Sequence, residues 1–180
     1  AETSKEFARA LDGLKGQKIT GIVLDLRNNP GGLFPDPVLD IAGQFLKNND
    51  VVLYEKYRDG TEKEYKAGSQ RGAVDLRVAV LVNSGTASAA EILAGALKDY
   101  KRAPLIGEPT YGKGSVQSIR QLSDGAALHI TTATWFTPKH TQIEGKGLEP
   151  DIPTPLTDES LQKGIDTQLN RAIEYLNKGA

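Results

Sequence analysis

"LRVAVLVNSGTASAAEILAGALKDY", residues 76–100, decides the fold. Its first part is an almost continuous apolar run rich in valine, which is typical of a strand buried on both faces of a sheet. The run passes through Ser84 and Gly85 into a segment with helical periodicity, and small residues crowd the start of that segment. We therefore expect a buried strand, a tight turn and a helix that packs closely on the sheet.

The stretches on either side continue this alternation of strands and helices. "ITGIVLDLR" (residues 19–27) is a second apolar run, and "NNPGG" (28–32) follows it at once, as in a central strand that feeds a tight loop. Alternating runs around Asp59 and Gly60 indicate a surface hairpin over residues 51–67. Helices are expected over 3–16, with Thr3 and Glu6 spaced as a capping box, 37–47 and about 158–178, and further strands over 102–107, 115–122 and 126–138.

The length and composition fit one ordinary domain over residues 1–180. The alternation of strands and helices predicts that this domain is α/β, with a mixed sheet and flanking helices. The net charge of −1 and the absence of a basic stripe give no case for nucleic acid or a membrane surface as partner. No apolar run approaches the roughly 18 residues that span a bilayer. The absence of cysteine excludes disulfides, thiolate metal sites and a cysteine nucleophile. The chain has no methionine, so we expect that sequence was removed upstream of Ala1.

Ser88 is the first candidate for chemistry. It lies at the expected start of the helix in residues 76–100, where free backbone N–H groups and the helix dipole favour a developing oxyanion. This segment alone favours a structural role over catalysis, because Thr86 or Ser88 can be nothing more than an N-cap and small residues allow close packing.

A nucleophilic serine needs a base, and the chain has two histidines, His129 and His140, with Asp25 as a possible orienting carboxylate. Neither histidine has a local arrangement that favours catalysis, so we interpret both as structural or surface residues. No pair of histidines has the spacing of metal ligands, and no carboxylate cluster accompanies them. We expect no metal and no cofactor.

Lys113 is the alternative base. It lies in "GEPTYGKGS" (residues 107–115), which differs from a phosphate-binding loop because Gly114 replaces the metal-binding hydroxyl and a strand pattern follows. A lysine acts as a base only when it is neutral, which requires its pKa to fall by about three units, and burial among apolar groups achieves this. Glycines on both sides and apolar flanking strands make Lys113 the best candidate for such burial. Gln117 lies four residues on, and a period of two puts it on the same face, where it can hold the lysine amine.

With these residues identified, the chain resembles the catalytic core of the C-terminal processing peptidases, the tail-specific serine proteases. The resemblance is clearest over residues 19–152 and follows five segments in order. They are "GIVLDLRNNPGGLF", "VLVNSGTASAAEILAGALKDYKR", "IGEPTYGKGSVQSI", "LSDGAALHITTATWFTP" and "GKGLEPDI".

The resemblance implies Ser88 as nucleophile, Lys113 as general base and Gln117 as the residue that orients the lysine. It also implies an oxyanion hole of backbone N–H groups, contributed by Ala89 and by Gly32, with Gly31 as the other possibility. Glu91 matches a family position close to the site and is given a supporting role. The implied fold is a ClpP/crotonase-like spiral core, and the implied activity is that of a cofactor-independent serine endopeptidase acting on polypeptides.

Two features separate this chain from the family pattern. Ala90 stands where many members carry serine, which we interpret as tolerated variation. No segment resembles the PDZ domain that usually precedes this core, so we expect that domain upstream in the full-length protein. The family is exported, which implies a periplasmic, cell-envelope or thylakoid-lumen location. The rival functions are a non-catalytic ligand-binding module on the same scaffold and a crotonase-like acyl-CoA enzyme.

Overall fold

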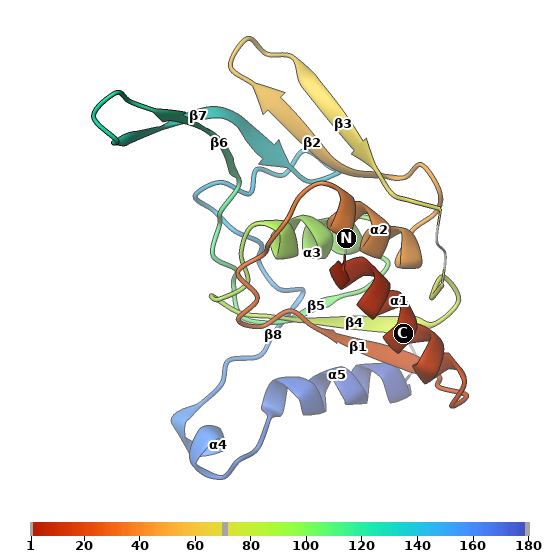
Figure 1. Ribbon diagram of the computed structural model, residues 1–180. Coiled ribbons are helices and arrows are strands. Elements are labelled where there is room, and N and C mark those ends of the chain that lie inside the picture. Colours follow the sequence, from red (N-terminus) through yellow and green to blue (C-terminus); the bar gives the residue numbers. More distant parts are fainter. Residues whose placement is uncertain (1, 70–71, 179–180) are drawn as a thin grey trace.

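The computed structural model describes residues 2–69 and 72–178 as two four-stranded sheets with helices between and around them (Figure 1). The first sheet is entirely parallel, in the order β1-β4-β5-β8. The second is antiparallel, in the order β3-β2-β7-β6. The parallel strands are β1 (Gly21–Asp25), β4 (Arg77–Val82), β5 (Leu105–Gly107) and β8 (Ile152–Pro153), and the antiparallel strands are β2 (Val51–Tyr57), β3 (Glu62–Lys66), β6 (Ser115–Gln121) and β7 (Ala127–Phe136).

Strand β4 lies at the centre of the molecule, which explains its continuous apolar sequence. Val78, Val80 and Val82 face the main core, which also contains residues of the helices α2 (Asp36–Phe45) and α3 (Ala89–Asp99). Ala79 and Leu81 face the opposite side, where α5 (Thr167–Lys178) covers the sheet. Figure 1 shows α5 on one side of the parallel sheet and α2 and α3 on the other. A strand buried on both faces is the arrangement that the sequence predicts.

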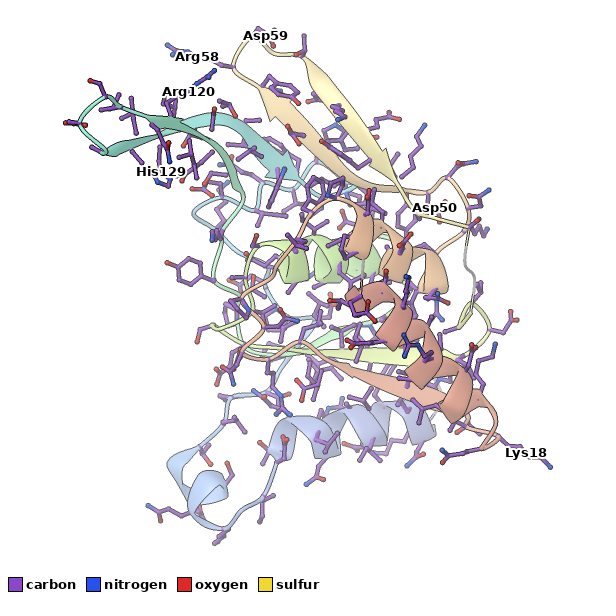
Figure 2. The ribbon with its side chains drawn as sticks, viewed as in Figure 1. Lys18, Asp50, Arg58, Asp59, Arg120 and His129 are labelled. Carbon is purple, nitrogen blue, oxygen red and sulfur yellow. The ribbon has the colours of Figure 1, made fainter. Side chains whose placement is uncertain are left out.

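The antiparallel sheet contains the hairpin expected around Asp59 and Gly60, with Gly60 at a φ of +87°. Strand β2 pairs with β7 only over residues 133–136, whereas β6 pairs with β7 along almost its whole length. The outer part of β6 and β7 is therefore a two-stranded ribbon that projects from the body of the protein, as Figure 1 shows. Figure 2 places Arg120 and His129 on this ribbon.

The α/β class with flanking helices is confirmed, with the parallel and antiparallel strands in separate sheets. None of the helices within the two described ranges combines the length and the apolar character that a membrane crossing requires.

Both terminal helices differ from the sequence prediction. The first is α1 (Glu2–Lys15), so Thr3 lies inside its first turn and is not the cap. The single helix expected over 158–178 is divided into α4 (Asp158–Gln162) and α5. Gly164 between them has a φ of +64°, a left-handed conformation that ends a helix, and Asp166 restarts it by accepting a hydrogen bond from Leu169 N at 2.9 Å.

Candidate active site

Ser88 is the N-cap residue of α3, at the turn where β4 passes into that helix. Its backbone has φ 56° and ψ −122°, outside the ordinary regions for a residue with a side chain. Strain of this kind persists only where the surroundings impose it, and it is concentrated at functional sites. Of the two caps that the sequence leaves open, Thr86 and Ser88, the second occupies the N-cap position, and its strained backbone is a further feature that simple capping does not require.

The loop after β1 supplies the surroundings that hold Ser88. Gly31 has a φ of +91°, and a Cβ atom there would lie 2.8 Å from Ala87 O, Ala89 N and Ser88 Cβ. Asn29 fixes the loop, because its side-chain oxygen accepts the N–H of Gly31 at 2.9 Å and its carbonyl accepts the N–H of Ala87 at 2.9 Å. Only glycine fits this approach, so the "NPGG" loop and the start of α3 form one surface.

Two backbone N–H groups are left without an acceptor on this surface. Within the described part of the chain, neither Gly32 N nor Ala89 N makes a hydrogen bond. The N–H of Gly31, in contrast, is already taken by Asn29. The loop and the helix therefore each contribute one backbone N–H group that is free to donate, at Gly32 and at Ala89.

Glu91 joins the two segments that carry Ser88 and Lys113. Its side chain is completely buried, and its Oε2 atom accepts the N–H groups of Ser88 at 2.9 Å and Lys113 at 2.8 Å. Its Oε1 atom accepts the Thr110 hydroxyl at 2.5 Å and the N–H of Gly112 at 2.7 Å. The backbones of Ser88 and Lys113 thus lie within two hydrogen-bond lengths of each other, although 25 positions separate them in the sequence.

Lys113 itself is exposed, so the burial predicted for it is wrong. The physical reason is that its loop is covered on one side only. The flanking glycines do allow the expected close approach: a Cβ atom at Gly112 would lie 2.8 Å from Gly147 N, and one at Gly114 would lie 2.6 Å from Glu144 N. The packed side of the loop is therefore the backbone side, and the lysine side chain extends from the other.

The shared face expected for Lys113 and Gln117 stays a prediction, because only Gln117 lies in the strand. Lys113 precedes β6, which begins at Ser115, and the pairing of β6 with β7 shifts register between Val116 and Gln117. The extra residue at this shift is Thr132 of β7, so β6 itself continues from Val116 to Gln117 without an insertion. Gln117 is exposed, and its Oε1 atom lies 3.2 Å from Nδ1 of His129 across the hairpin.

The two histidines and Asp25 have other partners. His129 is exposed on β7, and His140 stacks on Tyr54 with ring centroids 4.2 Å apart, so both are surface histidines as expected. Asp25 and Asp166 both pair with Arg27, at 2.6 Å and 2.8 Å. These two carboxylates raise the pKa of Arg27 further above its usual range, and the hydrogen bond from Arg27 lowers the pKa of Asp166.

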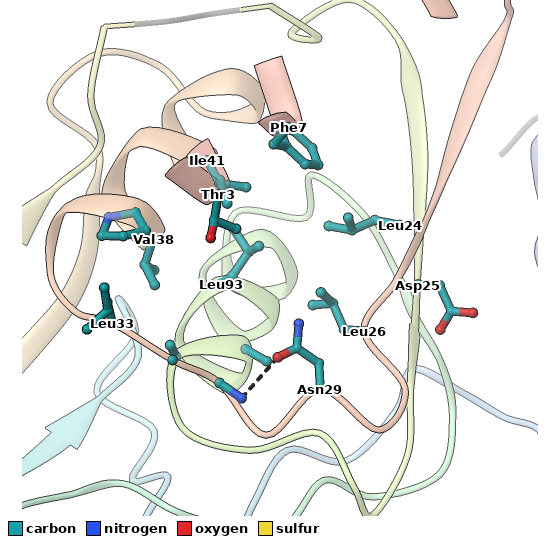
Figure 3. A pocket seen from close by; sticks show the side chains of 15 residues that line it. Thr3, Phe7, Leu24, Asp25, Leu26, Asn29, Leu33, Val38, Ile41 and Leu93 are labelled. Atoms are coloured by element: carbon teal, nitrogen blue, oxygen red, sulfur yellow. Dashed lines mark hydrogen bonds between the residues drawn. The ribbon is translucent and has the colours of Figure 1, made fainter. Parts of the chain in front are cut away.

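An apolar cavity of about 290 Å³ opens beside the glycine loop (Figure 3). Gly31, Gly32 and Ala89 form part of its lining, so it begins at the surface that holds Ser88. Helix α1 contributes Thr3 and Phe7 to the same cavity. The other lining residues are Leu24, Asp25, Leu26, Asn29, Leu33, Pro37, Val38, Ile41, Ala90 and Leu93.

Sequence reasoning missed three contributors to the site. Thr110 supplies one of the four donors to Glu91, Asn29 fixes Gly31, and Phe7 closes the cavity. Thr110 gave no local signal, because a threonine in a loop is ordinary. Asn29 lies in a run of turn-forming residues, which predicts the loop but not the hydrogen bond between Asn29 and Gly31. Across residues 2–69 and 72–178, no three His, Asp or Glu side chains gather as a metal site would need.

Comparison with known proteins gives one consistent result. The sequence profile described as "Peptidase family S41" matches residues 1–154. The chain is 44% identical to a "Carboxyl-terminal-processing protease" of Synechocystis sp., over 99% of this chain and 42% of that protein. It is 48% identical to "Carboxyl-terminal-processing peptidase 2, chloroplastic" of Arabidopsis thaliana, over 98% of this chain and 34% of that protein.

A solved structure described as "Photosystem II D1 C-terminal processing protease" superposes with a TM-score of 0.79 and 37% identity, over 86% of this chain and 40% of that one. The chain thus spans less than half the length of each of these three proteins. A profile match over most of the chain, agreement in fold, and relatives above 40% identity lead to a single assignment. The chain belongs to peptidase family S41.

Proposed function

We propose that this chain is the catalytic core of a serine endopeptidase of the C-terminal processing type, acting through Ser88 and Lys113. The observation that carries the proposal is the shared carboxylate of Glu91, which accepts the backbone N–H groups of both residues on one oxygen. A nucleophile and a base that act together need a fixed separation, and a buried acceptor common to both provides one.

Ser88 is the nucleophile in this proposal. Its hydroxyl attacks a peptide carbonyl, and the carbonyl oxygen gains negative charge as the tetrahedral intermediate forms. The unpaired N–H groups of Gly32 and Ala89 support this step, since an oxyanion hole requires donors that are not already satisfied. The N–H of Gly31 is bound to Asn29, which favours Gly32 as the second donor.

Lys113 is the general base, which takes the Ser88 proton and returns it to the leaving amine. Its exposed side chain has to lose water before it can be neutral at physiological pH. We infer that the bound polypeptide covers it, so that the base forms only in the complex. Gln117 orients the lysine amine in the same complex, which requires it to exchange its contact with His129.

The longer protein is proposed to carry more than this core. The chain spans 42% and 34% of the two curated relatives, which leaves room for a substrate-capturing PDZ domain upstream of the single core domain over residues 1–180. The Arabidopsis relative is described as chloroplastic. We propose an extracytoplasmic or lumenal location for this protein too.

The test is cleavage of casein by this chain, beside its Ser88→Ala and Lys113→Ala variants. We expect each variant to lose on the order of a thousandfold or more in rate, while circular dichroism shows an unchanged fold. Labelling with a fluorophosphonate provides a second readout, because it needs an activated serine and no captured substrate. Labelling of the native chain at Ser88, lost in Lys113→Ala, supports the proposal.

Two results would overturn it. One is undiminished cleavage by the Ser88→Ala variant. The other is a native chain that neither cleaves nor labels, also when the upstream region of the full protein is restored; that result favours a non-catalytic ligand-binding module.

A further inference from the structure

The apolar cavity begins where a substrate carbonyl has to lie. Gly31, Gly32 and Ala89 line its mouth, and Gly31 is in contact with the Ser88 side-chain position. A carbonyl that accepts hydrogen bonds from Gly32 and Ala89 brings its own residue to this mouth. The side chain of that residue is attached one carbon away from the carbonyl, so it has to enter the nearest space. The cavity is that space.

The walls of the cavity suit an apolar side chain. Two of the polar groups in its lining already have partners, because Asn29 Oδ1 accepts the N–H of Gly31 and Asp25 is paired with Arg27. A charged side chain would therefore be buried without a counter-ion, which is strongly unfavourable. Apolar surface comes from Phe7, Leu24, Leu26, Val38, Ile41 and Leu93.

Helix α1 limits the depth of the cavity. Figure 3 shows Phe7 at the end opposite Asn29 and the glycine loop. The Phe7 ring packs edge-on against Phe45, with centroids 5.8 Å apart, so Phe45 holds it in place. A cavity of about 290 Å³ bounded by Phe7 at this end accommodates a leucine or phenylalanine side chain.

We propose that this cavity is the specificity pocket of the enzyme, taking a medium-sized apolar side chain from the residue before the cleaved bond, and that Phe7 determines its depth. The inference rests on the proposed function of Ser88. It adds a substrate class, polypeptides cleaved after residues such as leucine, and a specificity-determining residue on the first helix.

Binding to the Ser88→Ala variant tests the pocket without requiring catalysis. Short peptides that differ only in a C-terminal Ala, Leu, Phe or Lys represent the cleaved product, and their affinities are measured by titration with NMR of the methyl groups. We expect Leu to bind at least about tenfold more tightly than Ala, Lys to bind most weakly, and the Ile41 and Leu93 methyl signals to shift. Equal affinities, or no shift at Ile41, overturn the proposal.

Two variants in the same Ser88→Ala background alter the pocket in opposite directions. Phe7→Ala deepens it and should move the preference from Leu toward Phe by about tenfold, whereas Ile41→Phe fills it and should move the preference toward Ala. Leu14→Ala is the matched control, because Leu14 lies on α1, is 41% exposed and does not line the cavity. Circular dichroism verifies that each variant is folded.

The two proposals can fail separately. Casein cleavage by the native chain and by Ser88→Ala tests the proposed role of Ser88. Peptide binding tests the specificity pocket, and it is measured in the Ser88→Ala variant, which is expected not to cleave. If Phe7→Ala and Ile41→Phe keep the preference of their parent, Phe7 does not set the depth even when Ser88 is the nucleophile.

Discussion

The segment that carries Ser88 and the segment that carries Lys113 are built in opposite ways. Ser88 lies between β4, of which all residues but the first are buried, and α3, whose residues from Ala89 to Leu97 are all buried. Lys113 lies on a surface loop that leads into an exposed two-stranded ribbon, where Ile119 is 60% exposed and Leu128 is 49% exposed. The core therefore holds Ser88, the proposed nucleophile, whereas Lys113, the proposed base, depends on a few specific contacts.

The difference shows that Glu91 connects a rigid half of the site, the buried segment around Ser88, to an exposed half, the loop at Lys113 and the ribbon that follows it. A two-stranded ribbon has little stability of its own. The loop that leads into it is fixed by the carboxylate of Glu91, which accepts the N–H groups of Gly112 and Lys113, and by further backbone contacts at Gly112 and Gly114. Disturbing Glu91 should thus affect both stability and chemistry, while changes on the ribbon away from Gln117 should affect neither strongly.

The largest effect is expected from Glu91→Gln. All four partners of Glu91 are donors, so an amide NH₂ in place of one oxygen faces two donors and leaves them unsatisfied inside the protein. We expect unfolding in urea to show a loss of about 3 kcal/mol in stability. Fluorophosphonate labelling of Ser88 should slow on the order of tenfold or more, since the positions of Ser88 and Lys113 are no longer fixed.

Thr110→Ser is the matched control for this change. It keeps the hydroxyl that donates to Glu91 and accepts the N–H of Leu148, so stability and labelling should stay close to native. A Glu91→Gln variant with native stability and labelling would show that the carboxylate does not join the two halves.

A smaller effect is expected at the outer end of the rigid half, in the pair formed by Arg27 and Asp166. Because Arg27 lowers the pKa of folded Asp166, the pair stabilises the protein fully above the usual carboxyl pKa of about 4 and loses this contribution as the pH falls through the lower folded value. Asp166→Asn keeps a capping side chain for α5 but removes the charge. The Asp166 side chain is 36% exposed, so solvent screens the ion pair. We therefore expect Asp166→Asn to lower the free energy of unfolding at pH 7 by less than about 1 kcal/mol.

Urea unfolding of both proteins between pH 7 and pH 3 checks this prediction. The stability difference between native protein and Asp166→Asn should shrink toward pH 3 and in high salt. A difference that stays constant over this range would mean that the ion pair does not contribute.

The smallest effects are expected on the ribbon. Ile119 and His129 are register partners on β6 and β7, and both are exposed. Ile119→Thr and His129→Ala should each change the stability by less than about 0.5 kcal/mol, and His129→Ala should keep substantial cleavage of casein. Loss of cleavage in a folded His129→Ala variant would transfer the role of base from Lys113 to His129 and reverse the comparison.

The sequence predicts best the features that depend on neighbouring residues. The strand, turn and helix around Ser88 follow from local periodicity and small residues, and the glycines beside Lys113 correctly predict a close backbone approach. The exposure of Lys113 was not predictable, because the burial of a loop residue depends on which distant segments cover the loop. The same holds for the contact of Gln117, whose Oε1 atom lies 3.2 Å from Nδ1 of His129 on the neighbouring strand.

The contacts that bring the separate segments of the site together join residues that are distant in sequence. Glu91 reaches Gly112, Asn29 reaches Ala87, and Phe7 closes a cavity that begins at Gly32. Each of these residues has an ordinary local role, as a helix, turn or core residue. Their shared role appears only when the chain is folded.

Inhibitor resistance is constrained by the close approach of Gly31 to Ser88. A compound that binds the backbone N–H groups of Gly32 and Ala89 contacts atoms that side-chain substitution does not remove. A Cβ atom at Gly31 would lie 2.8 Å from Ser88 Cβ, so any side chain there would displace the proposed nucleophile together with the compound. Escape would have to come from the apolar wall, at positions such as Ile41. Few substitutions could therefore cause resistance to a compound that binds these backbone groups and makes no contact with the apolar wall.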